Sequence, residues 1–187
     1  FGNDGDFSRR AMIGRINGDL ANDLGNLAQR SLSMIARNCD GKVPAAEETT
    51  ALRKLQVYGC LVLAHELLGK VRLLMDRQAF NEALEEIWKV VREANRCIDV
   101  DAPWTLRKTD PEAMASVLYV MAEIIRHLAI LLWPFMPDSS DRLLDQLAVP
   151  AEARAFDALV EGHSVAPGTS LPKPEGVFPR FADPGAG

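Results

Sequence analysis

Two kinds of polar side chain stand together on one helical face of this sequence, and both can recognise planar ligands. The stretch DLANDLGNLAQRSLSMI (19–35) has helical periodicity, yet its polar side carries Asn22, Asn26 and Arg30 rather than the Glu and Lys of a typical solvated face. Asn26 and Arg30 are four residues apart, so on a helix they emerge on consecutive turns. A planar amide and a five-donor guanidinium suit the edges of nucleotide bases, and a guanidinium also stacks on base planes.

The same face also fits a second interpretation. An ordinary solvated helix surface accommodates these residues if a charge contact forms between Asp23 and Arg30, or between Asp23 and Arg37. Helical periodicity taken alone favours this simpler interpretation.

The segment DAPWTLRK (101–108) is the second candidate for ligand binding. Pro103 fixes the backbone before Trp104, in a segment without helical periodicity to bury the indole. Arg107 and Lys108 follow closely. An aromatic ring on a rigid turn beside cations is a suitable platform for an unstacked base, worth about 1–3 kcal/mol per base. The alternative is that Trp104 closes one end of the protein core.

Composition limits the function classes. The chain has 187 residues, 48% of them hydrophobic and 25% charged, and a formal net charge of −5. That charge argues against a general nucleic-acid binder coated with Lys and Arg, but it does not exclude a small site that reads a few bases. The length suits one domain, or one domain with a tail. Because the sequence starts at Phe1 rather than Met, we expect it to be a piece of a longer protein.

Cysteine and histidine placement gives no metal site or disulfide framework. Cys39, Cys60 and Cys97 have no CxxC spacing, and we expect buried thiols of a reducing compartment. His65 and His127 fall within apolar helices and are expected to be packed or rim residues. No apolar run is long enough to suggest a membrane span, and no secretory segment opens the chain, so we expect a soluble, cytoplasmic protein with no membrane partner.

The elements that must position these residues are helices, because apolar residues recur at three- and four-residue steps and period-two alternation is nearly absent. A fourth long helix is predicted to start after Asp110 as N-cap and Pro111, and to be the most buried because it is apolar nearly all round. A short fifth helix, DRLLDQL, is predicted to be capped by 138–140, and AEARAFDALV forms a last helical piece. The long helices are predicted at 7–37 with a bend near Gly18, 47–76, 78–100 and 112–132, with a break at DVDAPWTLRKTDP.

Four long helices with short connections predict an all-α, antiparallel helical bundle. Along the second helix, one side is predicted to carry Leu52, Leu55, Leu63, Leu67 and Leu74. From Gly162 onward the chain holds five of its eleven prolines, which predicts an extended C-terminal tail. The expected organisation is a helical domain at 1–161 and a tail at 162–187.

Five stretches together resemble the C-terminal anticodon-binding domain of bacterial methionyl-tRNA synthetases, which are class I enzymes. They occur in the order of that family and span nearly the whole chain, and DGDFS resembles the junction that follows the catalytic domain. The LANDLGNLAQR and APW pieces are the most specific to the family. The five stretches are FGNDGDFS, LANDLGNLAQRSLSMI, EANRCIDVDAPW, LLWPFMPDSSDRLLDQL and GVFPRF.

The resemblance implies roles for particular residues. It implies that Asn26, Arg30 and Trp104 contact a CAU anticodon, with the indole stacked on its first base. Pro103 would then position Trp104, and Asn22 and Arg107 are weaker candidates for RNA contact. Sequence-specific RNA recognition usually reads splayed loop bases with a few well-placed groups, so a net charge of −5 is compatible with this role.

The resemblance further implies an ATP-dependent ligase that attaches methionine to its elongator and initiator tRNAs, with ATP and magnesium bound by a catalytic domain of the same chain. No catalytic residue, phosphate-binding loop, metal site or cofactor site is expected in these 187 residues. Two alternatives stay open. One is the equivalent domain of a cysteinyl-, leucyl-, isoleucyl- or valyl-tRNA synthetase, and the other is a helical module whose Asn/Arg face binds another protein.

Overall fold

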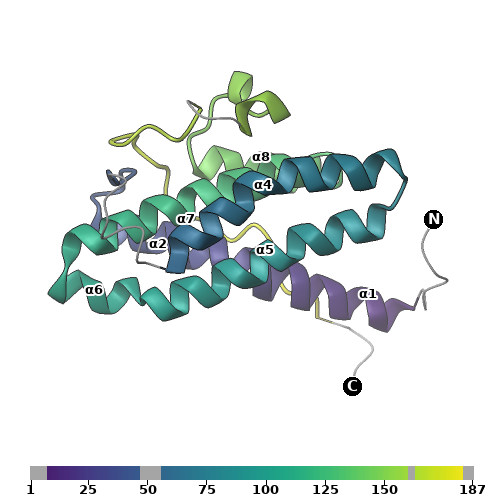
Figure 1. Ribbon diagram of the computed structural model, residues 1–187. Coiled ribbons are helices and arrows are strands. Elements are labelled where there is room, and N and C mark those ends of the chain that lie inside the picture. Colours follow the sequence, from purple (N-terminus) through teal and green to yellow (C-terminus); the bar gives the residue numbers. More distant parts are fainter. Residues whose placement is uncertain (1–7, 47–55, 160–162, 183–187) are drawn as a thin grey trace.

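The computed structural model describes residues 8–46, 56–159 and 163–182. In these residues the predicted all-α bundle is confirmed, and the only extended pairing is a single antiparallel bridge between Lys42 and Ser170. Figure 1 shows α6 at one end of the bundle and α1 at the other. The helices are α1 (Arg9–Arg15), η1 (Ile16–Gly25), α2 (Asn26–Asn38), α4 (Gln56–Asp76), α5 (Phe80–Asp101), α6 (Pro103–Thr109), α7 (Pro111–Leu132), α8 (Pro137–Gln146), η2 (Ala151–Ala153) and η3 (Phe156–Leu159).

The first helical stretch is continuous through α1, η1 and α2, but its middle part, η1, is π-helical. Ser8 caps its start by accepting a hydrogen bond from the amide of Ala11 at 3.1 Å; the predicted start at residue 7 lies outside the described residues. Gly18 lies within η1, and the bend predicted near it stays a prediction. The stretch ends as expected, because Asp40 and Gly41 both adopt positive φ.

α4 and α5 form an antiparallel hairpin (Figure 1). The predicted start of the second helix, 47–55, lies outside the described residues. The predicted leucine side is only partly buried, since Leu63 is 39% exposed whereas Leu67 is buried. The buried positions follow smaller side chains at helical spacing: Val57, Cys60, Ala64, Leu67 and Val71.

α7 is the central helix and packs against α2, α4, α5, α6 and α8. The predicted N-cap is confirmed, because the Asp110 carboxylate accepts a hydrogen bond from the amide of Ala113 at 3.0 Å and Pro111 occupies the first turn. Among the described helices, α7 alone is long and apolar enough to cross a membrane. The most apolar window of α7 is 83% buried inside the bundle, which identifies it as the core helix.

The predicted cap of α8 is wrong. The helix starts at Pro137, with Met136 at the N-cap position and no side-chain cap, and Ser140 is buried inside it. Proline is favoured in a first turn because its φ is already helical, so Pro137 places the start ahead of the three predicted capping residues.

Residues 163–182, called the C-terminal strap below, run back along the first helical stretch (Figure 1). Near the end of α2, the amide of Leu171 donates to the carbonyl of Gly41 at 2.8 Å. At the far end, the amide of Phe181 donates to the side chain of Asn17 at 2.8 Å, and the Asn17 amide donates back to the carbonyl of Phe181 at 3.0 Å. The strap is therefore extended, and is bound to the bundle along its length.

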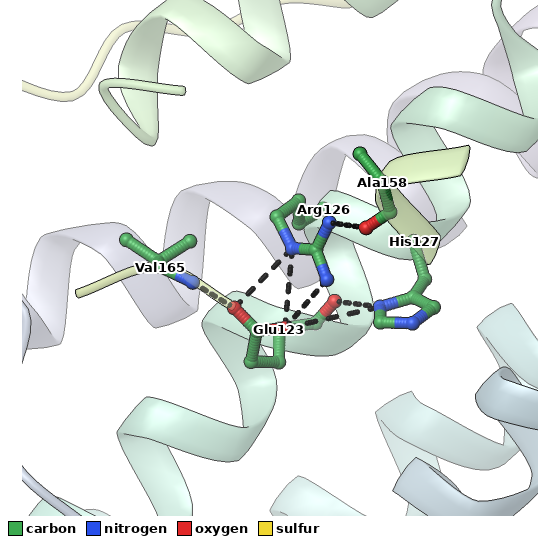
Figure 2. Close-up of polar contacts among 5 residues, drawn as sticks. All are labelled: Glu123, Arg126, His127, Ala158 and Val165. Carbon is green, nitrogen blue, oxygen red and sulfur yellow. Dashed lines mark hydrogen bonds and ion pairs between the residues drawn. The ribbon is translucent and has the colours of Figure 1, made fainter. Parts of the chain in front are cut away.

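A buried ion pair on α7 fixes the chain on both sides of residues 160–162. Glu123 and Arg126 are 3% and 2% exposed, and their closest nitrogen–oxygen distance is 2.9 Å. Figure 2 shows the Arg126 guanidinium donating to the carbonyl of Ala158 and the Glu123 carboxylate accepting from the amide of Val165, at 2.8 Å and 2.6 Å.

Candidate nucleic-acid interface

Trp104 lies on a short helix rather than on the irregular break that the sequence predicted. Ala102 adopts a left-handed conformation (φ 41°) that ends α5, and Pro103 then opens α6 in the first position, which proline favours. The amide of Thr105 donates to the Ala102 carbonyl at 2.8 Å and closes this turn. Pro103 is buried and Trp104 is 45% exposed. The indole is therefore not a plug of the core.

Arg30 of α2 joins Trp104 to the end of α5. Its guanidinium carbon lies 5.3 Å from the centroid of the indole ring, a cation–π distance worth about 0.5–1 kcal/mol at an exposed site. The same guanidinium donates to the carboxylate of Asp99 at 2.5 Å. Three separate helices thus meet at one cluster: α2, α5 and α6.

Arg30 does not form the charge contact with Asp23 that the simpler interpretation of this helix face suggested. Arg30 pairs with Asp99, 69 residues away along the chain. The pKa of Asp23 is raised, first by burial and then by the neighbouring charge of Asp19. Sequence reasoning missed Asp99, and helical spacing could not reveal it because the two residues belong to different helices.

Asn26 is exposed and lies one turn before Arg30 on α2. Within the described part of the chain, its side chain has no hydrogen-bond partner. An exposed amide with its donor and acceptor both available retains full capacity to recognise a ligand. Asn26, Arg30 and Trp104 therefore occupy one continuous surface.

The two weaker candidates differ in their placement. Asn22 lies one turn before Asn26 and accepts a hydrogen bond from Arg180 of the C-terminal strap at 2.7 Å. Arg107 donates to the side chain of Asn38 at 3.3 Å. Asn38 ends α2, about 12 Å along the helix axis from Arg30. Asn22 thus extends the surface of Asn26 and Arg30 on the η1 side, whereas the Arg107 side chain is bonded to Asn38 at the opposite end of α2.

The described residues contain no group of three or more His, Cys, Asp or Glu side chains that could hold a metal ion. His127 is buried, as predicted, and its ring lies 4.8 Å from that of His65 between centroids. Burial lowers the pKa of His127 to about 4, so the ring is neutral near pH 7. Cys60 and Cys97 are buried free thiols, also as predicted, and Cys39 is partly buried.

Comparison with known proteins gives consistent results. A family described as "Anticodon binding domain of methionyl tRNA ligase" matches residues 43–186. That range contains Pro103, Trp104 and Arg107, but it starts after Asn22, Asn26 and Arg30.

Curated relatives cover the first helix as well. A methionine–tRNA ligase of Brucella suis biovar 1 (strain 1330) is 51% identical over 98% of this chain and 35% of its own length. A methionine–tRNA ligase of Mesorhizobium japonicum is 49% identical over 100% of this chain and 36% of its own length. The chain therefore spans about a third of the length of these relatives.

Solved structures agree with the sequence comparison. The apo form of Mycobacterium tuberculosis methionyl-tRNA synthetase aligns with a TM-score of 0.91 and 45% identity, over 98% of this chain and 37% of that chain. A structure of the same enzyme bound by methionyl-adenylate gives a TM-score of 0.85 and 44% identity, over 92% and 34% of the two chains.

Proposed function

Since the chain belongs to the family of anticodon-binding domains of methionyl-tRNA ligase, we propose that it binds the CAU anticodon of methionine and initiator tRNAs. On this proposal it is the RNA-reading part of a cytoplasmic, ATP-dependent ligase that joins methionine to those tRNAs. ATP and magnesium would act in the remaining two thirds of that enzyme, because the residues here offer no phosphate-binding loop in their sequence. The catalytic domain of the same chain is the second proposed partner.

The observation that carries this proposal is the contact between Arg30 and the half-exposed indole of Trp104. A base that leaves its loop needs an aromatic surface for stacking and nearby groups that read its edge. The indole supplies the surface. The guanidinium of Arg30 and the amide of Asn26, which has no partner in the described part of the chain, supply donors and an acceptor within one helical turn of each other.

Asp99 orients the guanidinium of Arg30 in this site. It accepts from one nitrogen of Arg30, so the guanidinium is held against the indole in a defined direction while its other N–H groups remain available. The carboxylate also offsets the positive charge of Arg30. A site of this kind gains its specificity from placement more than from general attraction to phosphates.

The proposal is tested by titrating fluorescently labelled anticodon stem-loops with this chain and following the fluorescence of the RNA label. One stem-loop carries CAU, and the others are altered at each anticodon position. Trp104→Ala should weaken binding of the CAU loop roughly 5- to 150-fold, the equivalent of one stacked base. Arg30→Ala should reduce discrimination between loops more than it reduces affinity for all of them.

Trp133→Ala is a matched control, because Trp133 is also 45% exposed but lies at the end of α7. Its loss should leave CAU binding unchanged. Two results would refute the proposal: no preference of the wild-type chain for CAU, or equal effects of the two tryptophan substitutions. A large fall in stability of Trp104→Ala with unchanged RNA binding would mark the indole as structural.

A further inference from the structure

The GVFPRF segment of the C-terminal strap (176–181) forms one wall of a groove beside the proposed anticodon surface. The groove has a volume of about 510 Å³, and its other wall is the outer face of η1 and the start of α2. It is lined by hydrogen-bonding side chains and by the strap backbone: Asn22, Asn26, Gln29 and Arg180, together with Ala21, Gly25, Gly176, Val177 and Phe178.

The shape of this groove is fixed by close packing. Phe178 lies against Gly25, where an added Cβ would be 3.4 Å from the Phe178 ring and only 2.8 Å from the carbonyl oxygen of Leu20. The strap is tied on one side by Arg142, which donates to the carbonyls of Gly176 and Val177. The wall of the groove is therefore held in place without any bound ligand.

The polar groups in the groove are poorly satisfied within the protein. Gln29 uses its amide nitrogen on Ser33 at 3.1 Å, whereas its buried side-chain oxygen has no partner among the described residues. Asn26 is likewise without a partner there. The exposed amide of Asn26 therefore offers a donor and an acceptor to a ligand in the groove, whereas the Gln29 oxygen is closed off from solvent.

Arg180, like Arg107, contacts a neutral amide oxygen rather than a carboxylate within the described region. Arg30, Arg96, Arg126 and Arg154 each pair with a carboxylate. Arg180 is exposed, and its described contact is with the neutral amide oxygen of Asn22. Its positive charge is therefore not neutralised within the described residues.

Acidic residues near the groove do not change this conclusion. Asp19 of η1 pairs with Arg15 at 2.7 Å. Asp23 is partly buried, and its backbone carbonyl accepts from Asn95 of α5. Arg180 therefore presents an available cation at the mouth of a groove that otherwise offers amides.

We propose that Arg180 is a further RNA-contacting residue, which donates to a phosphate next to the nucleotide read at Asn26 and Arg30, and that the groove accepts the adjoining nucleotide. This inference rests on the proposed function. Asn26 and Arg30 are one turn of α2 apart, about 6 Å along its axis. Asn22 precedes them in η1 and contacts Arg180, so one RNA strand can follow these residues to Arg180. A guanidinium matches phosphate geometry, and the amides match base edges.

The test measures binding of the CAU stem-loop to this chain at several salt concentrations. Arg180→Gln removes the charge but keeps a polar side chain, and should weaken binding about tenfold at low salt. Because one phosphate contact is lost, the slope of log K against log salt should decrease by about 0.7–0.9. The loss should be similar for CAU and altered loops, and Arg180→Lys should recover most of the slope.

Arg142→Gln is the matched control. It removes one positive charge and one attachment of the same strap, but Arg142 does not line the groove. Its salt slope should equal that of the wild type. If both glutamine substitutions change affinity and slope equally, Arg180 only fastens the strap and the inference is wrong.

The two proposals fail in distinguishable ways. Wild-type binding that depends on Trp104, together with an unchanged slope in Arg180→Gln, overturns the role of Arg180 and leaves the anticodon site standing. Absence of CAU binding by the wild-type chain overturns both.

Discussion

Replacing Glu123 by glutamine should destabilise the protein strongly although the two side chains have nearly the same shape. The substitution keeps an oxygen that can accept from the amide of Val165, but it removes the negative charge that Arg126 faces inside the core (Figure 2). Arg126 is 2% exposed, so water cannot replace the lost partner. Breaking a buried pair in this way costs about 3–5 kcal/mol of unfolding free energy.

Urea unfolding followed by circular dichroism measures this cost. With a slope of about 2 kcal/mol per molar urea, a loss of 3 kcal/mol moves the midpoint down by roughly 1.5 M. Arg126→Met should also be destabilising, because it leaves Glu123 buried and unpaired and removes the donor to the carbonyl of Ala158. The double variant should lose less than the sum of the two single losses, since neither charge is then left alone.

Additive losses would refute this reasoning, because they would mean that the two charges do not stabilise each other. A Glu123→Gln variant within about 0.5 kcal/mol of the wild type would show that the pair is hydrated in solution rather than buried.

Two further predictions concern the bundle. His127 has a folded-state pKa of about 4, depressed by burial, against about 6.5 when unfolded. Below pH 6.5 the unfolded chain therefore binds a proton that the folded chain does not, so stability should fall between pH 6.5 and pH 4, by up to about 3 kcal/mol from this residue. Urea midpoints of His127→Asn should show less of this pH dependence than those of His163→Asn, an exposed control; equal dependence would contradict the assignment. Gly25→Ala should lower the thermal midpoint and loosen the strap at Phe178, because its new Cβ has no room, whereas Gly18→Ala, with nothing within 4 Å, should be tolerated. Similar midpoints for the two glycine variants would mean that the strap does not pack closely on η1.

Local features of the fold were predictable from the sequence because neighbouring residues determine them. Asp110 and Pro111 define a helix start through their own backbone and side-chain chemistry, and the nearly continuous apolar surface of 112–132 requires burial on all sides. The start of α8 was placed too late, because several residues near Pro137 can each begin a helix and sequence gives them similar weight.

Features that depend on distant residues were not predictable in this way. The helix α6 forms where Ala102 leaves α5 in a left-handed conformation, which alanine rarely adopts, and no periodicity signals it. The pairing of Arg30 with Asp99 joins two helices, and the bond between Asn22 and Arg180 joins η1 to the C-terminal strap. For the site itself, the sequence supplied the residue types and the family pattern, whereas their partners required the fold.

The charges of the described residues make the proposed RNA-binding surface compatible with a net charge of −5. Arg96, Arg126 and Arg154 each form an ion pair with a nearby carboxylate. Their charges therefore add little attraction for a distant phosphate. Arg30 is held in the same way, but its partner orients it against Trp104. Recognition at such a surface depends on stacking and base edges, and mismatched bases lose contacts that general electrostatic attraction cannot replace. A weakly charged surface therefore favours discrimination between anticodons over indiscriminate affinity for RNA.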